Sequence, residues 1–217
     1  MISRIIAQEK GLYRIITEQG EKLAEISGKF SYKALSLLDF PAVGDFVMAD
    51  WNENGGNAVI HHVLPRVSYF VCKAAGNIIQ EQIVAANVNT IFICMSLNND
   101  FNLRRLERYL SIAWQSRAVP VIVLTKSDLC NNLDDKLSKV YLVANGVDVV
   151  ITTTLEPVGY EHLRKFISEG KTVAFIGSSG VGKSTLINCL IKEKYLDVNG
   201  LRNDDKGRHT TTRRELI

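Results

Sequence analysis

Apolar and polar positions follow two different patterns along this 217-residue chain. Up to about residue 65, short β-prone runs alternate with turn sequences. The runs lie at 3–8, 12–17, 22–27, 45–50 and 57–63. Glycine-containing turns separate several of them, most clearly the segment NENGGN at 52–57. Five short strands joined by tight turns predict a small β-barrel of the OB type over residues 1–66.

From Thr90 onward, wholly apolar strands alternate with amphipathic helices. Strands are predicted at 90–96, 119–124, 147–151 and 172–176, and helices at 103–117, 133–145 and 159–168. Strands that are apolar throughout indicate a mainly parallel sheet covered by helices on both faces. The predicted fold class is therefore α/β: a barrel at 1–66, a connector at 67–89, and an α/β domain at 90–217.

Composition narrows the function only slightly. Hydrophobic residues make up 46% of the chain and charged residues 23%, and the formal net charge of +3 permits a nucleic-acid partner without arguing for one. The four cysteines stand far apart, which disfavours a disulfide framework or a zinc knuckle. No apolar run approaches transmembrane length, so we expect a cytoplasmic protein without a membrane partner.

The strongest motif is a candidate phosphate loop after the strand at 172–176. Its residues are Gly177, Ser178, Ser179, Gly180, Val181, Gly182, Lys183 and Ser184, followed by Thr185, and they satisfy GxxxxGK[ST]. Glycines let successive backbone N–H groups point at phosphate oxygens, and the helix dipole adds to the attraction. Lys183 is expected to reach the β- and γ-phosphates and Ser184 to bind Mg²⁺. The alternative is a chance glycine-rich turn, which the flanking strand and helix disfavour.

A candidate base-reading element, Thr125, Lys126, Ser127 and Asp128, follows the strand at 119–124. A carboxylate at Asp128 can accept hydrogen bonds from two guanine N–H groups, each worth about 1.5–3 kcal/mol, whereas adenine offers neither donor. The tetrapeptide alone is a weak motif, but it lies at the strand end where α/β sheets bind ligands. Thr153 and Thr154, after the next strand, are either a further contact to the base or an ordinary run of strand threonines.

The order of these elements is unusual, because Asp128 lies 49 residues before Gly177. Small GTPases place the phosphate loop first, so this order is a circular permutation. Further segments fit such a protein: VGDFV at 43–47, QIVAANVNTIFI at 82–93, LRRLERYL at 103–110 and KGRHTTTRREL at 206–216. With TKSDL at 125–129 and GSSGVGKSTLIN at 177–188, they make the chain resemble the RsgA (YjeQ) family of circularly permuted GTPases over essentially its whole length.

The resemblance implies a GTP-hydrolysing assembly factor that binds GTP or GDP with Mg²⁺ and acts on the small ribosomal subunit and its rRNA. It implies catalytic roles for Lys183 and for Thr211 of switch I, with Ser184 and Thr211 as Mg²⁺ ligands; Thr210 is the alternative to Thr211. The family lacks the usual water-orienting glutamine, which implies slow hydrolysis that the subunit stimulates. His209 is expected to be a contact residue rather than a base. We expect a monomer.

Several departures from the family pattern stand out. Thr125 replaces the asparagine usual among GTPases, which is expected to remove a bridge to the phosphate loop, and Asn89 stands where aspartate is expected. The family continues into a DxPG element and a zinc-bearing domain, neither of which is within these 217 residues. Zinc is therefore expected only in that domain, and no zinc ligands are assigned in this chain. The segment DVNG at 197–200 fits DxxG but precedes switch I, so we interpret it as a loop without that role.

An RNA-binding role for the barrel rests mainly on the resemblance. Residues 1–66 contain seven Lys and Arg against eight Asp and Glu, so no strong field attracts phosphates. Five aromatic residues offer stacking surfaces or core packing: Tyr13, Phe30, Tyr32, Phe46 and Trp51. Two alternatives to the GTPase switch remain open: a module that binds RNA and guanine nucleotides with little hydrolysis, and an ATP-dependent P-loop enzyme, against which Asp128 argues.

Overall fold

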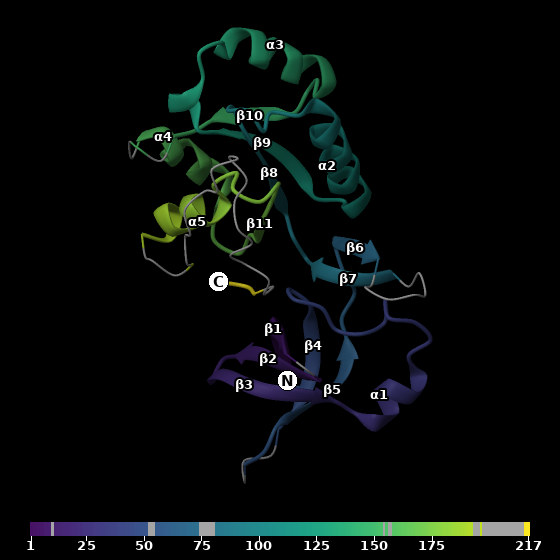
Figure 1. Cartoon of the computed structure of the whole chain (residues 1–217). Coiled ribbons are helices and arrows are strands. Elements are labelled where there is room, and N and C mark those ends of the chain that lie inside the picture. Colours follow the sequence, from purple (N-terminus) through teal and green to yellow (C-terminus); the bar gives the residue numbers. More distant parts are fainter. Residues whose placement is uncertain are drawn as a thin grey trace. The chain divides into compact units, whose positions relative to one another are not determined.

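The structure is a computed structural model that describes residues 1–9, 11–51, 55–73, 81–153, 155, 158–192, 196 and 215–217. The chain divides into two compact units (Figure 1). The first comprises Met1–Val88 together with the described residues 215–217, and the second lies within Asn89–Thr212. None of the described helices combines the length and the apolar character needed to cross a membrane.

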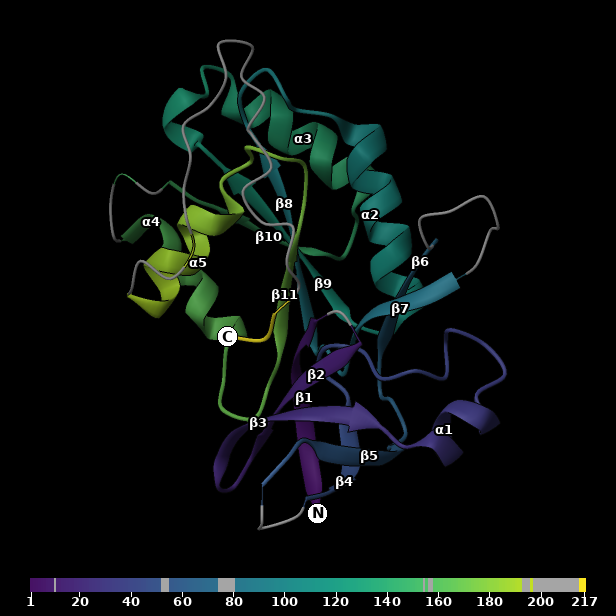
Figure 2. The same cartoon turned by 60° about the horizontal axis from the view of Figure 1, so that its bottom comes forward.

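Five strands of the first unit form a closed barrel, as predicted. They are β1 (Ile2–Glu9), β2 (Leu12–Thr17), β3 (Gly20–Ile26), β4 (Phe46–Asp50) and β5 (Ala58–Val63). Around the barrel the order is β1-β2-β3-β5-β4, with β3 and β5 parallel and the other neighbours antiparallel (Figure 2). Closure leaves no free sheet edge. Because side chains alternate along each strand, Ile5, Ile15 and Ile60 point into a shared core.

The barrel also separates its aromatic residues into core and surface. Tyr13 is buried in the core, so it supports packing rather than stacking on a base. Trp51 packs against the same core and lies under the Lys22 ammonium, 3.3 Å from the ring centroid. Phe46 and Tyr32 are exposed, and the Arg4 guanidinium lies 4.9 Å from the centre of the Phe46 ring. Phe46 and Tyr32 are therefore the candidates for contacts outside the barrel.

The VGDFV segment at 43–47 leads into β4, and the surrounding structure explains two of its residues, Gly44 and Asp45. Gly44 has φ +92°, and a Cβ there would overlap the carbonyl oxygen of Ala86. Asp45 is fully buried and accepts hydrogen bonds from Arg66 at 2.7 and 2.8 Å and from the backbone N–H of Ala42 at 2.8 Å. Arg66 also donates to two backbone carbonyls of the preceding loop. This paired and hydrogen-bonded carboxylate fixes the loop that enters β4.

Two elements of the first unit were not predicted. A short helix, α1 (Gly28–Lys33), begins at Ser27, whose hydroxyl accepts from the Phe30 N–H at 3.1 Å. The expected connector contains an antiparallel hairpin of β6 (Tyr69–Lys73) and β7 (Glu81–Ala86). Asn87, with φ +56°, turns the chain between this hairpin and the next strand. The predicted division into a barrel at 1–66, a connector at 67–89 and a GTPase domain at 90–217 stays a prediction.

The second unit contains the expected parallel sheet. Its strands are β8 (Thr90–Ser96), β9 (Val119–Thr125), β10 (Asp148–Ile151) and β11 (Val173–Ile176), in the order β10-β9-β8-β11. All three pairings are parallel. At the start of β8, the Asn89 side-chain oxygen accepts from the Thr172 N–H at 2.9 Å, and its backbone carbonyl accepts from Val119 at 2.9 Å. Asn89 thus joins the beginnings of three strands.

Helices cover both faces of this sheet. On one face, α2 (Leu103–Ser116) and α3 (Leu133–Val143) lie side by side, and on the other lie α4 (Val158–Glu161) and α5 (Lys183–Ile191) (Figures 1 and 2). The helix predicted at 159–168 is instead the short α4 followed by a 3₁₀ helix at His162–Phe166. One hydrophobic core lies under α5, where Phe92 contacts the rings of Phe166 and Phe175.

Candidate functional site

The four parallel strands end at the same edge of the sheet, and each is followed by a loop with polar residues. These loops are Leu97–Asn102 after β8, Lys126–Cys130 after β9, Thr152–Thr153 after β10 and Gly177–Gly182 after β11. Ligands of α/β sheets bind beyond this edge. Because β8 lies between β9 and β11, its loop lies between the base-reading element and the phosphate loop.

The phosphate loop has the backbone that its glycines predict. Gly180 and Gly182 have φ values of +77° and +99°, in the left-handed region. A Cβ at Gly177 would overlap the carbonyl oxygen of Cys94 on the neighbouring strand β8. Glycine at 177 therefore allows β11 and β8 to stay paired up to the point where the loop begins.

The phosphate loop leads directly into α5, and the N-terminus of this helix is suited to an anion. Gly182 is the N-cap and offers no side chain to the first N–H groups of the helix, and the first turn carries no acidic residue. The half-buried Ser184 and Thr185 lie in this turn. The positive end of the helix dipole is therefore directed at this loop, which favours an anion such as phosphate there.

Lys183 lies over the same loop. Its ammonium donates to the carbonyl oxygens of Gly177 and Ser178, at 2.9 and 2.7 Å. Burial holds the pKa of Lys183 below its ordinary value. Burial also raises the pKa of the neighbouring Cys94 thiol to about 12, so this thiol stays protonated and neutral near pH 7. A phosphate would find the lysine charge already directed at the loop.

The base-reading element follows β9 in a tight turn. Lys126 adopts a left-handed backbone (φ +57°), and a 3₁₀ turn at Ser127–Leu129 presents Asp128 at the surface. The Asp128 carboxylate accepts a hydrogen bond from the Thr153 hydroxyl at 2.9 Å. The structure thus brings Thr153 to the carboxylate of Asp128, the candidate base reader; Thr154 lies outside the described residues. Gly159, at the start of α4, passes so close to Thr153 that a Cβ there would collide with it.

The expectation that Thr125 removes a bridge to the phosphate loop was wrong. The Thr125 hydroxyl donates to the carbonyl oxygen of Val181 at 2.6 Å. Both residues are buried, so this hydrogen bond is shielded from water. A threonine suffices because the strand end and the loop lie close enough for a short side chain to span them.

Sequence reasoning missed Asp100, in the loop after β8. Its carboxylate accepts from the Ser178 hydroxyl of the phosphate loop at 2.6 Å and from Arg105 of α2 at 2.8 Å. Burial raises its pKa, but hydrogen bonds from Ser178 and Arg105, with the charges of Arg105 and Lys126, together hold it below the ordinary value. No motif marks this aspartate; the available signal was its position just beyond the end of a parallel strand.

Comparison with known families covers most of the chain: a match to the RsgA GTPase family extends over residues 63–217. The chain belongs to this family. The small ribosomal subunit biogenesis GTPase RsgA 2 of Lactiplantibacillus plantarum is 50% identical to it, over all of this chain and 61% of that protein. RsgA 1 of Oceanobacillus iheyensis is 42% identical, over all of this chain and 62% of that protein. The chain thus spans about three fifths of the length of these RsgA relatives.

Solved structures show the same fold. YjeQ of Thermotoga maritima superposes with a TM-score of 0.70 at 24% identity, covering 94% of this chain and 68% of that one. YloQ, described as a circularly permuted GTPase, gives a TM-score of 0.61 at 21% identity, covering 87% and 63%. The second unit of this RsgA-family chain therefore has the circularly permuted GTPase fold, in which the segment TKSDL precedes GSSGVGKS along the chain.

Other predicted site residues are not placed. Thr210 and Thr211 of switch I, His209 and the DVNG segment at 197–200 lie outside the described residues. Within the part of the chain that is described, no three side chains of His, Cys, Asp or Glu gather in a way that would hold a metal.

Proposed function

We propose that this chain carries the nucleotide-binding part of a GTPase that acts in late maturation of the small ribosomal subunit, with hydrolysis stimulated by that subunit. The observation that carries the proposal is the link between two predicted elements: the base-reading turn and the phosphate loop lie at one sheet edge, joined by the hydrogen bond from Thr125 to Val181. The names of the RsgA relatives supply the biological setting.

On the base side, the proposed reader is Asp128. Its carboxylate accepts from the N1–H and 2-amino groups of guanine, and adenine would leave it without those donors. Thr153 orients the carboxylate through its hydroxyl. The rest of the base site is formed by Thr125, Lys126, Ser127 and Thr154. Lys126 would lay its alkyl stem along the ring.

On the phosphate side, residues Gly177–Thr185 would enclose the phosphates through backbone N–H groups. Lys183 would exchange its contacts with loop carbonyls for contacts with the β- and γ-phosphates. Ser184, with Thr211 from switch I, would hold Mg²⁺. The ion, when bound, neutralises charge that develops on the phosphate oxygens. Lys183 and Thr211 are the proposed catalytic residues.

For partners, we propose the small ribosomal subunit with its rRNA, and no membrane. The barrel is the proposed rRNA-contacting part, because OB-type barrels commonly bind RNA through a strand face and this one exposes Phe46 beside Arg4. A cytoplasmic location and a monomeric state complete the proposal.

The first test is calorimetric binding of GDP and ADP, with Mg²⁺, to this chain, to Asp128→Ala and to Asp134→Ala. Asp134 is an exposed aspartate on α3 and serves as the charge-matched control. We expect GDP to bind well and ADP hardly at all, with the preference lost only in Asp128→Ala. Equal binding of ADP and GDP to the unaltered chain would overturn the guanine assignment.

Hydrolysis is tested separately. Once GDP binding is established, the rate of GTP hydrolysis is measured for this chain and for a full-length RsgA relative. Each protein is assayed by itself and with purified small ribosomal subunits. Stimulation by the subunit supports the GTPase switch. A guanine-binding full-length chain that does not turn over GTP, even with the subunit, would instead support a binding module.

A further inference from the structure

The loop between β8 and α2 is built to hold its shape. The Asn98 side-chain oxygen accepts from the Ser96 hydroxyl at 2.8 Å and from the Asp100 N–H at 3.1 Å. Asn102 caps α2 by accepting from the Arg105 N–H at 3.0 Å. These local hydrogen bonds replace the backbone pairs that a loop lacks. The Asp100 carboxylate is therefore presented from a fixed support.

Two contacts direct this carboxylate at the phosphate loop. One oxygen of Asp100 accepts from both the Ser178 hydroxyl at 2.6 Å and the Arg105 guanidinium at 2.8 Å. About a quarter of each charged side chain is exposed, 25% for Asp100 and 27% for Arg105. Hydrogen bonds to a charged group in such a partly buried setting are stronger than neutral ones. Asp100 thus fixes Ser178 from outside the phosphate loop.

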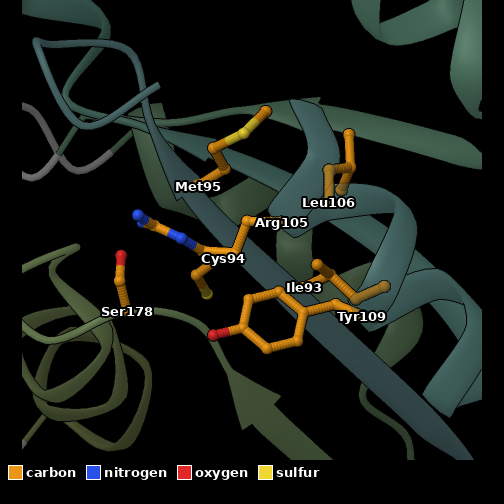
Figure 3. A pocket seen from close by; sticks show the side chains of 7 residues that line it. All are labelled: Ile93, Cys94, Met95, Arg105, Leu106, Tyr109 and Ser178. Carbon is orange, nitrogen blue, oxygen red and sulfur yellow. The ribbon is translucent and has the colours of Figure 1, made fainter. Parts of the chain in front are cut away.

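A small pocket between β8, α2 and the phosphate loop shows how these parts meet. Figure 3 shows Arg105 and Ser178 extending toward each other above Cys94, with the Tyr109 hydroxyl directed into the same space. The pocket is otherwise lined by Ile93, Met95 and Leu106. Strand β8 lines the pocket with Ile93, Cys94 and Met95, whereas α2 contributes the polar groups of Arg105 and Tyr109.

Ser178 is consequently held from two sides. Its backbone carbonyl accepts from Lys183 at 2.7 Å, and its hydroxyl donates to Asp100. The first contact competes with nucleotide, because the same ammonium is the group expected to reach the phosphates. The second does not compete, because Asp100 approaches from α2 and β8 rather than from the loop interior.

We propose that Asp100 is a positioning residue for the phosphate loop, which holds Ser178 in place when Lys183 leaves the loop carbonyls for a nucleotide phosphate. This inference rests on the proposed function, since it assumes that the loop binds phosphate. In this proposal Asp100 acts through Ser178 and is not a catalytic residue. The Arg105 and Lys126 charges keep the carboxylate from adding a net negative charge beside the phosphates.

The test compares GDP affinity, by calorimetry with Mg²⁺, among the unaltered chain, Asp100→Ala, Ser178→Ala and the double variant. Loss of one charged hydrogen bond predicts a roughly tenfold weaker affinity for each single variant. The double variant should be no weaker than either single one, because both remove the same contact. Asp100→Asn keeps an acceptor and should fall between. Asp148→Ala, an exposed aspartate at the opposite sheet edge, is the control.

A second readout needs no nucleotide. Amide hydrogen exchange of the peptide covering 177–182 should become faster in Asp100→Ala and in Ser178→Ala, and stay unchanged in Asp148→Ala, with the melting temperature nearly constant. If the unaltered chain binds GDP and the variants bind it equally well, or if the two losses add, the inference is wrong. If the chain binds no GDP, the proposed function fails. Independently of GDP binding, unchanged amide exchange of the peptide covering 177–182 in Asp100→Ala would show that Asp100 does not hold Ser178 in place.

Discussion

The phosphate side and the base side of the candidate site are held in different ways. The phosphate loop is fixed by buried or half-buried contacts from outside itself: Thr125 to Val181, Asp100 to Ser178, and Gly177 against Cys94. Asp128, the proposed base reader, is exposed, and its carboxylate accepts a hydrogen bond from the Thr153 hydroxyl.

This difference suggests that the two sides contribute differently to nucleotide binding. A loop that is fixed before the ligand arrives loses little entropy on binding, so the phosphate side is suited to supplying affinity. The exposed carboxylate supplies selectivity, because a base without matching donors would leave its charge unpaired. Substitutions on the phosphate side should therefore weaken the binding of every nucleotide, whereas substitutions on the base side should weaken the binding of guanine nucleotides alone.

The largest effect is expected from Gly177→Ala. The new Cβ would overlap the Cys94 carbonyl at a backbone with φ +153°, and displacing the loop or the strand should cost about 3 kcal/mol, or a roughly hundredfold loss of GDP affinity. Any weak binding of ADP should lose affinity by the same factor as the binding of GDP. Gly170→Ala is the control, because Gly170 has φ +72° but open space around it. Retained GDP affinity in Gly177→Ala, measured by calorimetry, would contradict the rigidity of this side.

Thr125→Val tests the hydrogen bond that joins the two sides. The valine has nearly the same shape, but it leaves the buried Val181 carbonyl without this donor, at a cost of about 1–3 kcal/mol. We expect a lower free energy of unfolding in urea and a GDP affinity that is weaker by about tenfold. Thr152→Val is the matched control: Thr152 is also buried, but its hydroxyl contacts the Leu124 carbonyl at 3.3 Å and not the loop. Equal behaviour of the two variants would show that the link is unimportant.

Thr153→Val should affect the base side alone. Removing the hydroxyl that orients Asp128 is expected to weaken GDP binding about fivefold, corresponding to about 1 kcal/mol. Binding of inorganic pyrophosphate, which has no base, should not change. Thr153→Ser keeps the hydroxyl and should retain affinity. A loss of pyrophosphate binding equal to that of GDP would break the proposed division between the sides.

The smallest effect is a proton coupling at Lys183. Its pKa is below the ordinary value of 10.5, so between these two values the unfolded chain binds more protons, and stability rises with pH in that window. Bound phosphate favours the charged amine, so GDP binding should take up a fraction of a proton and weaken as pH rises through the lowered pKa. Calorimetry in buffers of different ionisation enthalpy measures this uptake. Lys183→Arg should show none, and proton release in the unaltered chain would contradict the assignment.

Sequence patterns predicted the barrel strands and the strands of the parallel sheet because these depend on local features, namely apolar runs and turn sequences. The nucleotide-binding roles of the two motifs stay predictions. The sequence patterns did not predict the β6–β7 hairpin, because residues 67–89 were interpreted as a connector and no local pattern marked the turn at Asn87. They also misjudged Thr125 and missed Asp100. Both depend on which strands are neighbours, and the pairing of β8 with β11 brings together residues that no local pattern connects.

The same pairing has a consequence for biosynthesis. In the order β10-β9-β8-β11, the strand that carries the phosphate loop is the last of the four to be made, yet it must dock beside β8, the first. The growing chain can therefore assemble three strands and still lack half of its nucleotide site. Long-range strand pairing of this kind is slow, and until β11 arrives the apolar edge of β8 is open to aggregation. Acquisition of GDP binding during translation should thus be a late, single event rather than a gradual one.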